Sequence, residues 1–121
     1  MVEVRITDQF EDWYRDLDEA DQVAIARIVG LLEVRGVTLG EQYSSAIKGS
    51  RHALRELRVM SRGRPFRVFY AFDPKRRAVL LIGGDKGGDK RFYEVYVPMA
   101  DQLFDEYLVE TADEDDNPEE G

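Results

Sequence analysis

The chain has 121 residues, 43% of them hydrophobic, with no cysteine, one histidine and a formal net charge of -8. A chain of this length forms one domain that buries roughly two-thirds of its unfolded surface, so it needs no disulfide or metal to hold it together. The absence of cysteine excludes thiol chemistry and Cys-containing zinc sites, and a lone histidine is too few for a nitrogen-ligated metal centre. We expect neither a metal nor a cofactor.

The sequence shows no membrane or export signal. The N-terminus, MVEVRITDQFEDW, lacks the long apolar core of a signal peptide, and no apolar run approaches the ~20 residues of a membrane span. We therefore expect a cytoplasmic protein with no membrane partner.

The residue pattern in the first third of the sequence predicts a strand followed by a helical hairpin. Apolar residues alternate with charged ones over positions 2–6, which is the period of a half-buried strand. Thr7 stands where it can cap a first helix, and Asp18 opens a second one. Gly36 is placed to end the second helix in the left-handed conformation. The two helices should lie together on a sheet.

The middle of the chain predicts a loop and then three strands. Residues 37–52 are rich in glycine and serine and read as a loop that includes a short helix around 41–47. Three apolar or mixed runs follow at 53–60, 66–73 and 78–83, separated by SRGRP and DPKRR, which have the composition of tight turns. Sequential strands with such short links pair as an antiparallel meander.

The C-terminal part predicts one helix and a tail. Pro98 suits the first position of a helix, and an apolar stripe follows it as far as Leu108. The last residues, ETADEDDNPEEG, offer nothing apolar to offset the entropy of ordering them. We therefore predict a domain at 1–109 and a disordered acidic tail at 110–121. Such a tail either shields a cationic face by its charge or simply keeps the protein soluble.

Basic residues are segregated along the sequence. Thirteen lysines and arginines, against four acidic residues, lie between Lys48 and Arg91 in a chain whose total charge is negative. Clustered cations on one face neutralise phosphates whatever the global charge. In strand geometry Glu56 and Arg58 share one face, and Arg67 lies on the neighbouring strand. This pattern fits a solvated sheet face neutralised by Glu56, or a concave surface on which guanidinium groups grip phosphate oxygens.

A glycine-rich basic segment follows the last predicted strand. The sequence GGDKGGDKRFYEVY holds four glycines together with Lys86, Lys90, Arg91 and Tyr93. It lacks the Gly-Lys-Ser/Thr of a phosphate-binding loop and the GxGxxG of a dinucleotide fold, which excludes both. We expect a mobile cationic loop with phenol groups at the edge of the sheet.

These elements follow one another in a specific order. Three predicted strands come first: apolar-Glu-Leu-Arg at 54–58, Arg-Val-Phe-Tyr at 67–70 and an apolar strand at 79–82. A Gly-rich lysine segment at 83–91 and a helix after a proline at 98–108 follow them. This order resembles the HigB-like, phage-related branch of the RelE/ParE toxin superfamily, over most of residues 1–108 but not over the acidic tail. The resemblance implies an α+β, RelE-like fold, in which an N-terminal helical hairpin packs on a small antiparallel sheet and a helix ends the domain.

The resemblance also implies a function. It indicates the toxin of a type II toxin–antitoxin system, with a cognate helix-turn-helix antitoxin as partner and with ribosome-dependent cleavage of mRNA as a metal-independent endoribonuclease. In such a reaction the RNA supplies its own nucleophile, because a 2′-hydroxyl attacks the adjacent phosphate. The protein must then stabilise the added negative charge and move a proton at each end.

The resemblance assigns the site to six residues, namely Arg58, Arg67, Lys86, Lys90, Arg91 and Tyr93. The strand arginines would clamp the phosphate and the transition state, the cations of the glycine-rich segment would stabilise charge or donate a proton, and the tyrosine would stack on a base or transfer a proton. His52 is a further candidate, as general base, because the ordinary pKa of histidine lies near neutrality. A histidine at the start of a strand is, however, more often a surface residue.

The sequence leaves two other functions open. A ParE-like toxin of the same fold would inhibit DNA gyrase without cutting RNA, and a catalytically silent module would bind an antitoxin or nucleic acid through the basic face. The basic segment after the last strand favours the ribonuclease over the gyrase inhibitor. Charge alone does not separate binding from cutting.

Overall fold

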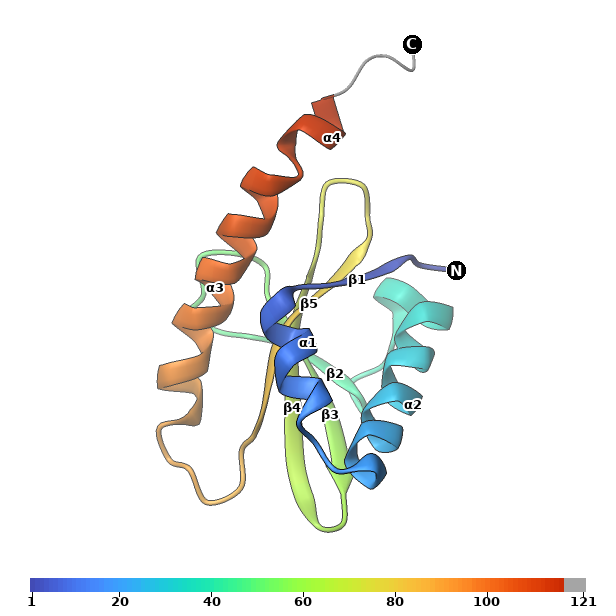
Figure 1. The fold of residues 1–121 in the computed structure, drawn as a ribbon, viewed down its shortest axis with the longest axis vertical. Helices are drawn as coiled ribbons and strands as arrows, with labels where there is room; N and C mark the ends of the chain where they lie inside the picture. Colours follow the sequence, from blue (N-terminus) through green and yellow to red (C-terminus); the bar gives the residue numbers. More distant parts are fainter. Residues whose placement is uncertain (117–121) are drawn as a thin grey trace.

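The computed structural model describes the backbone of residues 1–116 and the side chains of residues 1–114. Its centre is a five-stranded sheet in the order β1-β5-β4-β3-β2. The strands are β1 (Val4–Ile6), β2 (Ser44–Ala46), β3 (Arg55–Ser61), β4 (Arg64–Phe72) and β5 (Ala78–Asp85). The helices are α1 (Asp8–Arg15), α2 (Glu19–Arg35), α3 (Phe92–Glu110) and α4 (Ala112–Asp116), with a 3-10 turn, η1 (Gly36–Thr38), after α2. Helices α1 and α2 cover one face of the sheet and α3 covers the other (Figure 1).

The three central strands confirm the predicted antiparallel meander, with Arg58 directly opposite Arg67 and a bulge in β5 opposite Phe69 and Tyr70. The sheet is nevertheless mixed, because β1 pairs with β5 in parallel. The chain leaves β1 into the helical hairpin, crosses one face and returns at the opposite edge as β2. The parallel pair of β1 and β5 needs a long connection, which here contains both helices and strands β2 to β4, whereas hairpin turns suffice within the meander. Within residues 1–116, no helix has the combined length and apolar character needed to cross a membrane.

Strand alternation divides the apolar side chains between two cores. The core beneath α1 and α2 contains Phe10, Ile25, Leu32, Leu57, Val59, Val68 and Leu80. The core beneath α3 contains Phe69, Val79, Leu81, Phe92, Ala100 and Phe104. Each fully covered large side chain contributes about 1.5 to 3 kcal/mol to folding. The predicted α+β architecture, with a helical hairpin on a sheet and a helix near the C-terminus, is confirmed.

The helical hairpin begins and ends where the sequence predicts. The Thr7 hydroxyl accepts a hydrogen bond from the Phe10 N–H at 3.0 Å and caps α1, and Asp18 is the N-cap residue of α2. Gly36 follows α2 with φ of +54°, and a Cβ added there would lie 2.7 Å from a methyl group of Val2. Glycine is therefore required both for the turn and for the passage of the N-terminal segment beside it.

The prediction of a short helix around residues 41–47 is wrong. This segment forms a turn and then the edge strand β2, in which Ser44 lies opposite Leu57. The Arg58 N–H donates to the carbonyl of Tyr43 at 2.8 Å, and the Ser44 and Tyr70 hydroxyls share a buried 2.6 Å hydrogen bond. Pairing with β3 outweighs local propensity here, because the backbone of β3 would otherwise lack hydrogen-bond partners on that side.

The last long helix begins earlier than predicted. Helix α3 starts at Phe92, and Pro98 lies inside it rather than at its first position. An internal proline removes one backbone hydrogen bond and strains the preceding turn. Burial of Phe92 and Val97 against the sheet offsets this penalty, because a helix starting at Pro98 would leave that face of β4 and β5 uncovered.

Two glycines of the predicted mobile loop are in fact packed strand residues. Gly83 and Gly84 belong to β5 and are buried. A Cβ added at Gly83 would lie 2.3 Å from the Trp13 ring, and one added at Gly84 would lie 2.8 Å from the Tyr96 ring. The glycines therefore admit an aromatic ring from α1 on one face of the sheet and one from α3 on the other.

The predicted acidic tail begins as helix in the structure, with α3 ending at Glu110 and α4 following at Ala112–Asp116. Residues 117–121 lie outside the described part of the chain, and disorder of the tail stays a prediction. The Glu114 carboxylate pairs with Arg77 at 2.9 Å and with Arg5 at 3.1 Å. Arg77 is itself buried against Asp73, which also accepts the Tyr107 hydroxyl at 2.7 Å. Burial and the neighbouring Asp73 carboxylate raise the pKa of Tyr107 to about 12, so its phenol remains a donor.

A second buried carboxylate fixes the β3–β4 hairpin to α2. Asp21 accepts hydrogen bonds from the Ser61 hydroxyl at 2.6 Å and from the Arg62 guanidinium at 2.9 Å, and it also pairs with Arg64. Hydrogen bonds from Arg62 and then Ser61 hold the pKa of Asp21 below its ordinary value. The charged form of Asp21 therefore stabilises the folded state.

We predict that Gly83→Ala lowers the free energy of unfolding by about 1 to 3 kcal/mol, because the new methyl group overlaps the Trp13 ring. Gly30→Ala is the matched control. It lies in α2 with nothing within 4 Å of an added Cβ, and should stabilise the protein by about 0.5 to 1 kcal/mol. Urea denaturation measures both, and equal effects of the two substitutions would contradict the packing role of Gly83.

We predict that Asp21→Asn destabilises the protein at pH 7 and that this effect shrinks in acid. A carboxyl group with a depressed folded pKa stabilises above its unfolded pKa, ~3.9, and loses that contribution as pH falls through the folded pKa. Urea midpoints of the wild type and the variant should therefore converge below about pH 4. Asp12→Asn, at a side chain 75% exposed, is the control; a gap for Asp21→Asn that stays constant with pH would refute the argument.

Candidate functional site

A buried glutamate on the α3 face of the sheet gathers four polar groups. The Glu56 side chain is 7% exposed. It accepts the Tyr93 hydroxyl at 2.7 Å and the Ser45 hydroxyl at 3.0 Å. The Nε atoms of Arg67 and Arg58 lie 3.5 Å and 3.8 Å from its carboxylate. We call these five residues the Glu56 cluster.

Secondary structure explains why the Glu56 cluster forms. Alternation along β3 places Glu56 and Arg58 on the same face, as predicted, and the register of the meander sets Arg67 of β4 opposite Arg58. Strand β2 brings Ser45 opposite Glu56. The first turn of α3 supplies Tyr93. Four elements therefore converge on one carboxylate.

Arg67 is the most deeply held cation of the cluster. Its side chain is 13% exposed, and one terminal nitrogen donates to the Phe66 carbonyl at 3.0 Å. Its buried Nε has no hydrogen-bond partner within the described part of the chain, and a Glu56 carboxylate oxygen lies 3.5 Å from it. A buried unpaired donor costs about 1 to 3 kcal/mol. The guanidinium therefore has donor capacity that the folded chain does not use.

Arg58 is the exposed cation of the cluster and separates two hollows. Its guanidinium donates to the Glu41 carbonyl at 3.1 Å and to the Ser45 hydroxyl at 3.0 Å, with the side chain 43% exposed. The first hollow, of about 440 Å³, is also lined by Lys48, Glu56 and Tyr93. The second, of about 410 Å³, is also lined by Arg27 and Arg67. Three of the four cations named here are arginines, whose forked guanidinium groups suit phosphate.

Tyr93 completes the cluster as a hydrogen-bond donor. Burial, followed by the hydrogen bond to Glu56, raises the pKa of Tyr93 above its usual range, so the phenol is neutral at physiological pH. The Lys86 ammonium lies 5.8 Å from the centre of the Tyr93 ring. Arg58, Arg67, Lys86 and Tyr93, all predicted from the sequence, are therefore brought to one region.

Sequence comparison places the chain among known proteins. It matches the family model of phage-derived Gp49-like proteins (DUF891) over residues 12–105. The chain belongs to the Gp49-like family. It is 38% identical over 103 residues to the Mycobacterium tuberculosis protein named "Putative toxin HigB3", covering 84% of this chain and 89% of that protein. It is 35% identical over 104 residues to "Putative toxin HigB2" of the same organism, covering 84% of this chain but only 52% of that protein.

Comparison with solved structures confirms the fold of this Gp49-like chain. The toxin–antitoxin complex RelBE of Escherichia coli contains a chain that superposes with a TM-score of 0.52 at 13% sequence identity. The match covers 70% of the Gp49-like chain and 95% of the other. The predicted RelE-like fold and the resemblance to HigB-like proteins are both confirmed.

The remaining cations of the glycine-rich segment lie outside the Glu56 cluster of the Gp49-like chain. Arg91 directly precedes α3 and pairs with Glu94 at 3.1 Å, with 74% of its side chain exposed. Lys90 is exposed in the turn before α3. Within the described residues, neither forms a hydrogen bond or ion pair with the cluster. They can contribute long-range charge but are not positioned as Arg67 is.

His52 lies apart from the Glu56 cluster and has a structural environment. Its Nε2 lies 2.7 Å from the Asp105 carboxylate, and its ring packs edge to face on Phe104 with centroids 4.9 Å apart. Asp105 is about 18 Å further along α3 than Tyr93, from the rise of an α-helix. The structure therefore does not place His52 with the other candidates, and the suggestion that it is the general base is not carried forward.

Sequence reasoning missed two members of the cluster. Glu56 was expected only to neutralise a neighbour, although its place between two arginine positions on one strand face was the available signal. Ser45 gave no signal, because its segment was expected to be helical. The acidic Glu114, in turn, is held beyond the far end of α3 and does not cover the cluster.

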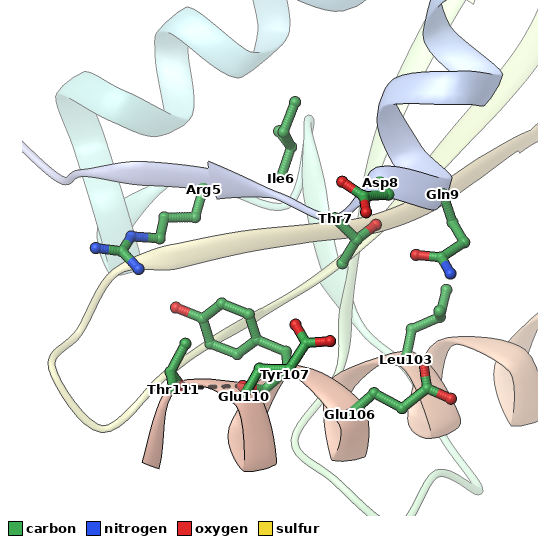
Figure 2. A pocket seen from close by; sticks show the side chains of 10 residues that line it. All are labelled: Arg5, Ile6, Thr7, Asp8, Gln9, Leu103, Glu106, Tyr107, Glu110 and Thr111. Carbon is green, nitrogen blue, oxygen red and sulfur yellow. Dashed lines mark hydrogen bonds between the residues drawn. The ribbon is translucent and has the colours of Figure 1, made fainter. Parts of the chain in front are cut away.

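A third hollow does not suit phosphate. It measures about 270 Å³ and lies between β1, the start of α1 and the last turns of α3. Figure 2 shows the carboxylates of Asp8, Glu106 and Glu110 on its walls, with Arg5 as the cation. Arg5 is already paired with Glu3 at 3.1 Å. Negative charge dominates this hollow, so the Glu56 cluster remains the candidate site.

We predict energetic coupling between Tyr93 and Glu56. In a double-mutant cycle on urea stability, Tyr93→Phe and Glu56→Gln should show a coupling of about 0.5 to 3 kcal/mol, because the hydroxyl and the carboxylate share one buried hydrogen bond. His52→Ala combined with Glu56→Gln is the control and should be additive within about 0.5 kcal/mol. An additive Tyr93 and Glu56 pair would contradict the described cluster.

Proposed function

We propose that this Gp49-like chain is the toxin of a type II toxin–antitoxin system and cleaves mRNA as an endoribonuclease. The observation that carries the proposal is the Glu56 cluster, in which one buried carboxylate lies close to two guanidinium groups and accepts a hydrogen bond from a phenol. Arg58 and Tyr93 border the hollow of about 440 Å³, whereas Arg58 and Arg67 border the neighbouring one of about 410 Å³. The toxin names of the two M. tuberculosis relatives support the toxin role.

The proposed reaction needs groups that this cluster supplies. A 2′-hydroxyl of the RNA loses its proton to solvent water and attacks the adjacent phosphorus, and the bond from phosphorus to the 5′-oxygen breaks; protonation of that oxygen leaves a cyclic phosphate and a 5′-hydroxyl. Arg58 and Arg67 stabilise the additional charge on the phosphate oxygens through their guanidinium groups. The neutral Tyr93 phenol can donate a proton to the leaving oxygen. Because RNA provides the nucleophile, no metal ion is required.

The charge distribution supports the idea that another macromolecule presents the RNA to the Glu56 cluster. The whole chain carries -8, so its clustered cations act at short range, on RNA that is already held close to them. The cluster itself borders hollows of about the size of a nucleotide rather than a long basic track. We therefore propose that mRNA is cut on the ribosome, in the cytoplasm. The E. coli RelBE toxin–antitoxin complex supports a cognate antitoxin as the second partner, which we propose to be a helix-turn-helix protein.

We predict that Arg67→Ala reduces RNA cleavage by about 100- to 1,000-fold, the usual effect of removing one transition-state donor. Expression from a tightly controlled promoter, with mapping of RNA 5′ ends and growth, measures the effect. Lys75→Ala, at an exposed position in the β4–β5 turn, is the control and should behave as the wild type. Thermal unfolding of purified Arg67→Ala checks that the variant is folded.

Two outcomes would contradict the proposal. Growth arrest by the wild type with intact transcripts would remove the ribonuclease activity, and an accompanying DNA-damage response would select gyrase inhibition instead. Equal small losses for Arg67→Ala and Lys75→Ala would reduce the role of the cluster to general electrostatic attraction.

A further inference from the structure

A second surface of the molecule is apolar and open, near the C-terminal end of α2. Two neighbouring hollows, of about 500 Å³ and 360 Å³, share Val37 and Phe72 in their walls. Val37 is 80% exposed, and Val34, in the last turn of α2, is 64% exposed. Exposed valines are common singly, but a contiguous apolar surface around two hollows is typical of an interaction site.

The backbone explains why these side chains point outward. Gly36 turns the chain out of α2 in a left-handed conformation, and η1 then directs Leu39 into the core while Val37 remains outside. Phe72, at the end of β4, is half-buried and forms the common floor of both hollows. The apolar surface is therefore built on the η1 turn and the end of a strand.

The charges around this surface are all of one sign. Arg35 and Arg76 line the larger hollow and Arg55 lines the smaller one. Among the residues that the structure describes, no carboxylate lines either hollow. Three arginines around an apolar floor are unexpected on a protein whose net charge is -8. They match a ligand that combines apolar groups with negative charge.

We propose that this surface binds an amphipathic acidic helix of a partner protein. Two apolar side chains one helical turn apart would enter the two hollows, and carboxylates beside them would pair with Arg35, Arg55 and Arg76. The end of the chain itself does not fit this description, because residues 117–121, NPEEG, carry no large apolar side chain. The inference goes beyond RNA cleavage and does not depend on it, since it concerns an adjoining surface; only Ala46 and Ile47 line both its smaller hollow and the hollow of about 440 Å³ beside the Glu56 cluster.

Binding of synthetic helical peptides tests the proposal. The first is a fluorescein-labelled 18-residue peptide with leucines at i, i+3, i+4 and i+7 and glutamates beside them, and matched peptides carry glutamine or lysine in place of glutamate. Fluorescence anisotropy with the full chain should show saturable binding of the glutamate peptide, several-fold weaker binding of the glutamine peptide, and loss of affinity with added salt. The lysine peptide should bind weakest.

Variants of the chain locate the binding. Val37→Asp should weaken the glutamate peptide about tenfold or more, because it places a like charge in the apolar contact. Arg35→Glu should weaken the glutamate peptide and strengthen the lysine peptide. Val109→Asp, at another valine that is 77% exposed, is the control and should leave all affinities unchanged. Both valines are exposed, so folding should survive each substitution, which thermal unfolding verifies.

Several results would overturn the proposal. The first two are the absence of saturable binding by the glutamate peptide, and binding that Val37→Asp leaves unchanged. The other two are self-association of the chain in sedimentation that Val37→Asp abolishes, and displacement of the peptide by anionic lipid vesicles but not by neutral ones. The last two would assign the surface to a second copy of the chain or to a membrane. Because the readout is peptide binding, a failure of the proposed nuclease activity would not alter it.

Discussion

The buried carboxylate of Glu56 is what allows two arginines to face each other across β3 and β4. Like charges placed directly opposite on neighbouring strands repel, and Arg58 and Arg67 occupy such a pair. Glu56 lies close to both guanidinium groups and also accepts the Tyr93 hydroxyl, so it compensates the repulsion and orients the phenol at the same time. Breaking a buried ion pair by removing one partner leaves an uncompensated charge. The geometry of the site therefore depends on one acid that need not touch substrate.

The same arrangement holds other parts of the fold together. Asp21 of α2 pairs with arginines of the β3–β4 hairpin. Asp73 pairs with Arg77, which also pairs with Glu114. Much of the basic segment between Lys48 and Arg91 is thus neutralised inside the molecule. The segregation of basic residues in the sequence was first interpreted as a sign of substrate binding. In part it has a structural cause, because the acidic N-terminal hairpin and the acidic C-terminal helix need basic partners on the sheet between them.

Two surfaces of the molecule carry its proposed roles. The Glu56 cluster lies on the α3 side of the sheet, where polar side chains border hollows of nucleotide size. The apolar surface around Val37 and Phe72 lies by the end of α2 and has arginines but no lining carboxylate in the described chain. The same sheet supports both surfaces, and they adjoin at the end of β2, where Ala46 and Ile47 line a hollow of each.

Local patterns in the sequence determined the helical hairpin, the three-stranded meander and the face shared by Glu56 and Arg58, because alternation, caps and turns are set by neighbouring residues. Only the tertiary structure decided that 44–46 is a strand, that α3 begins at Phe92, and that Gly83 admits Trp13, because each rests on contacts between segments distant in the chain. His52 illustrates the limit. Its chemistry suggested a catalytic base, but its partner Asp105 comes from the far part of α3, and no local pattern records that contact.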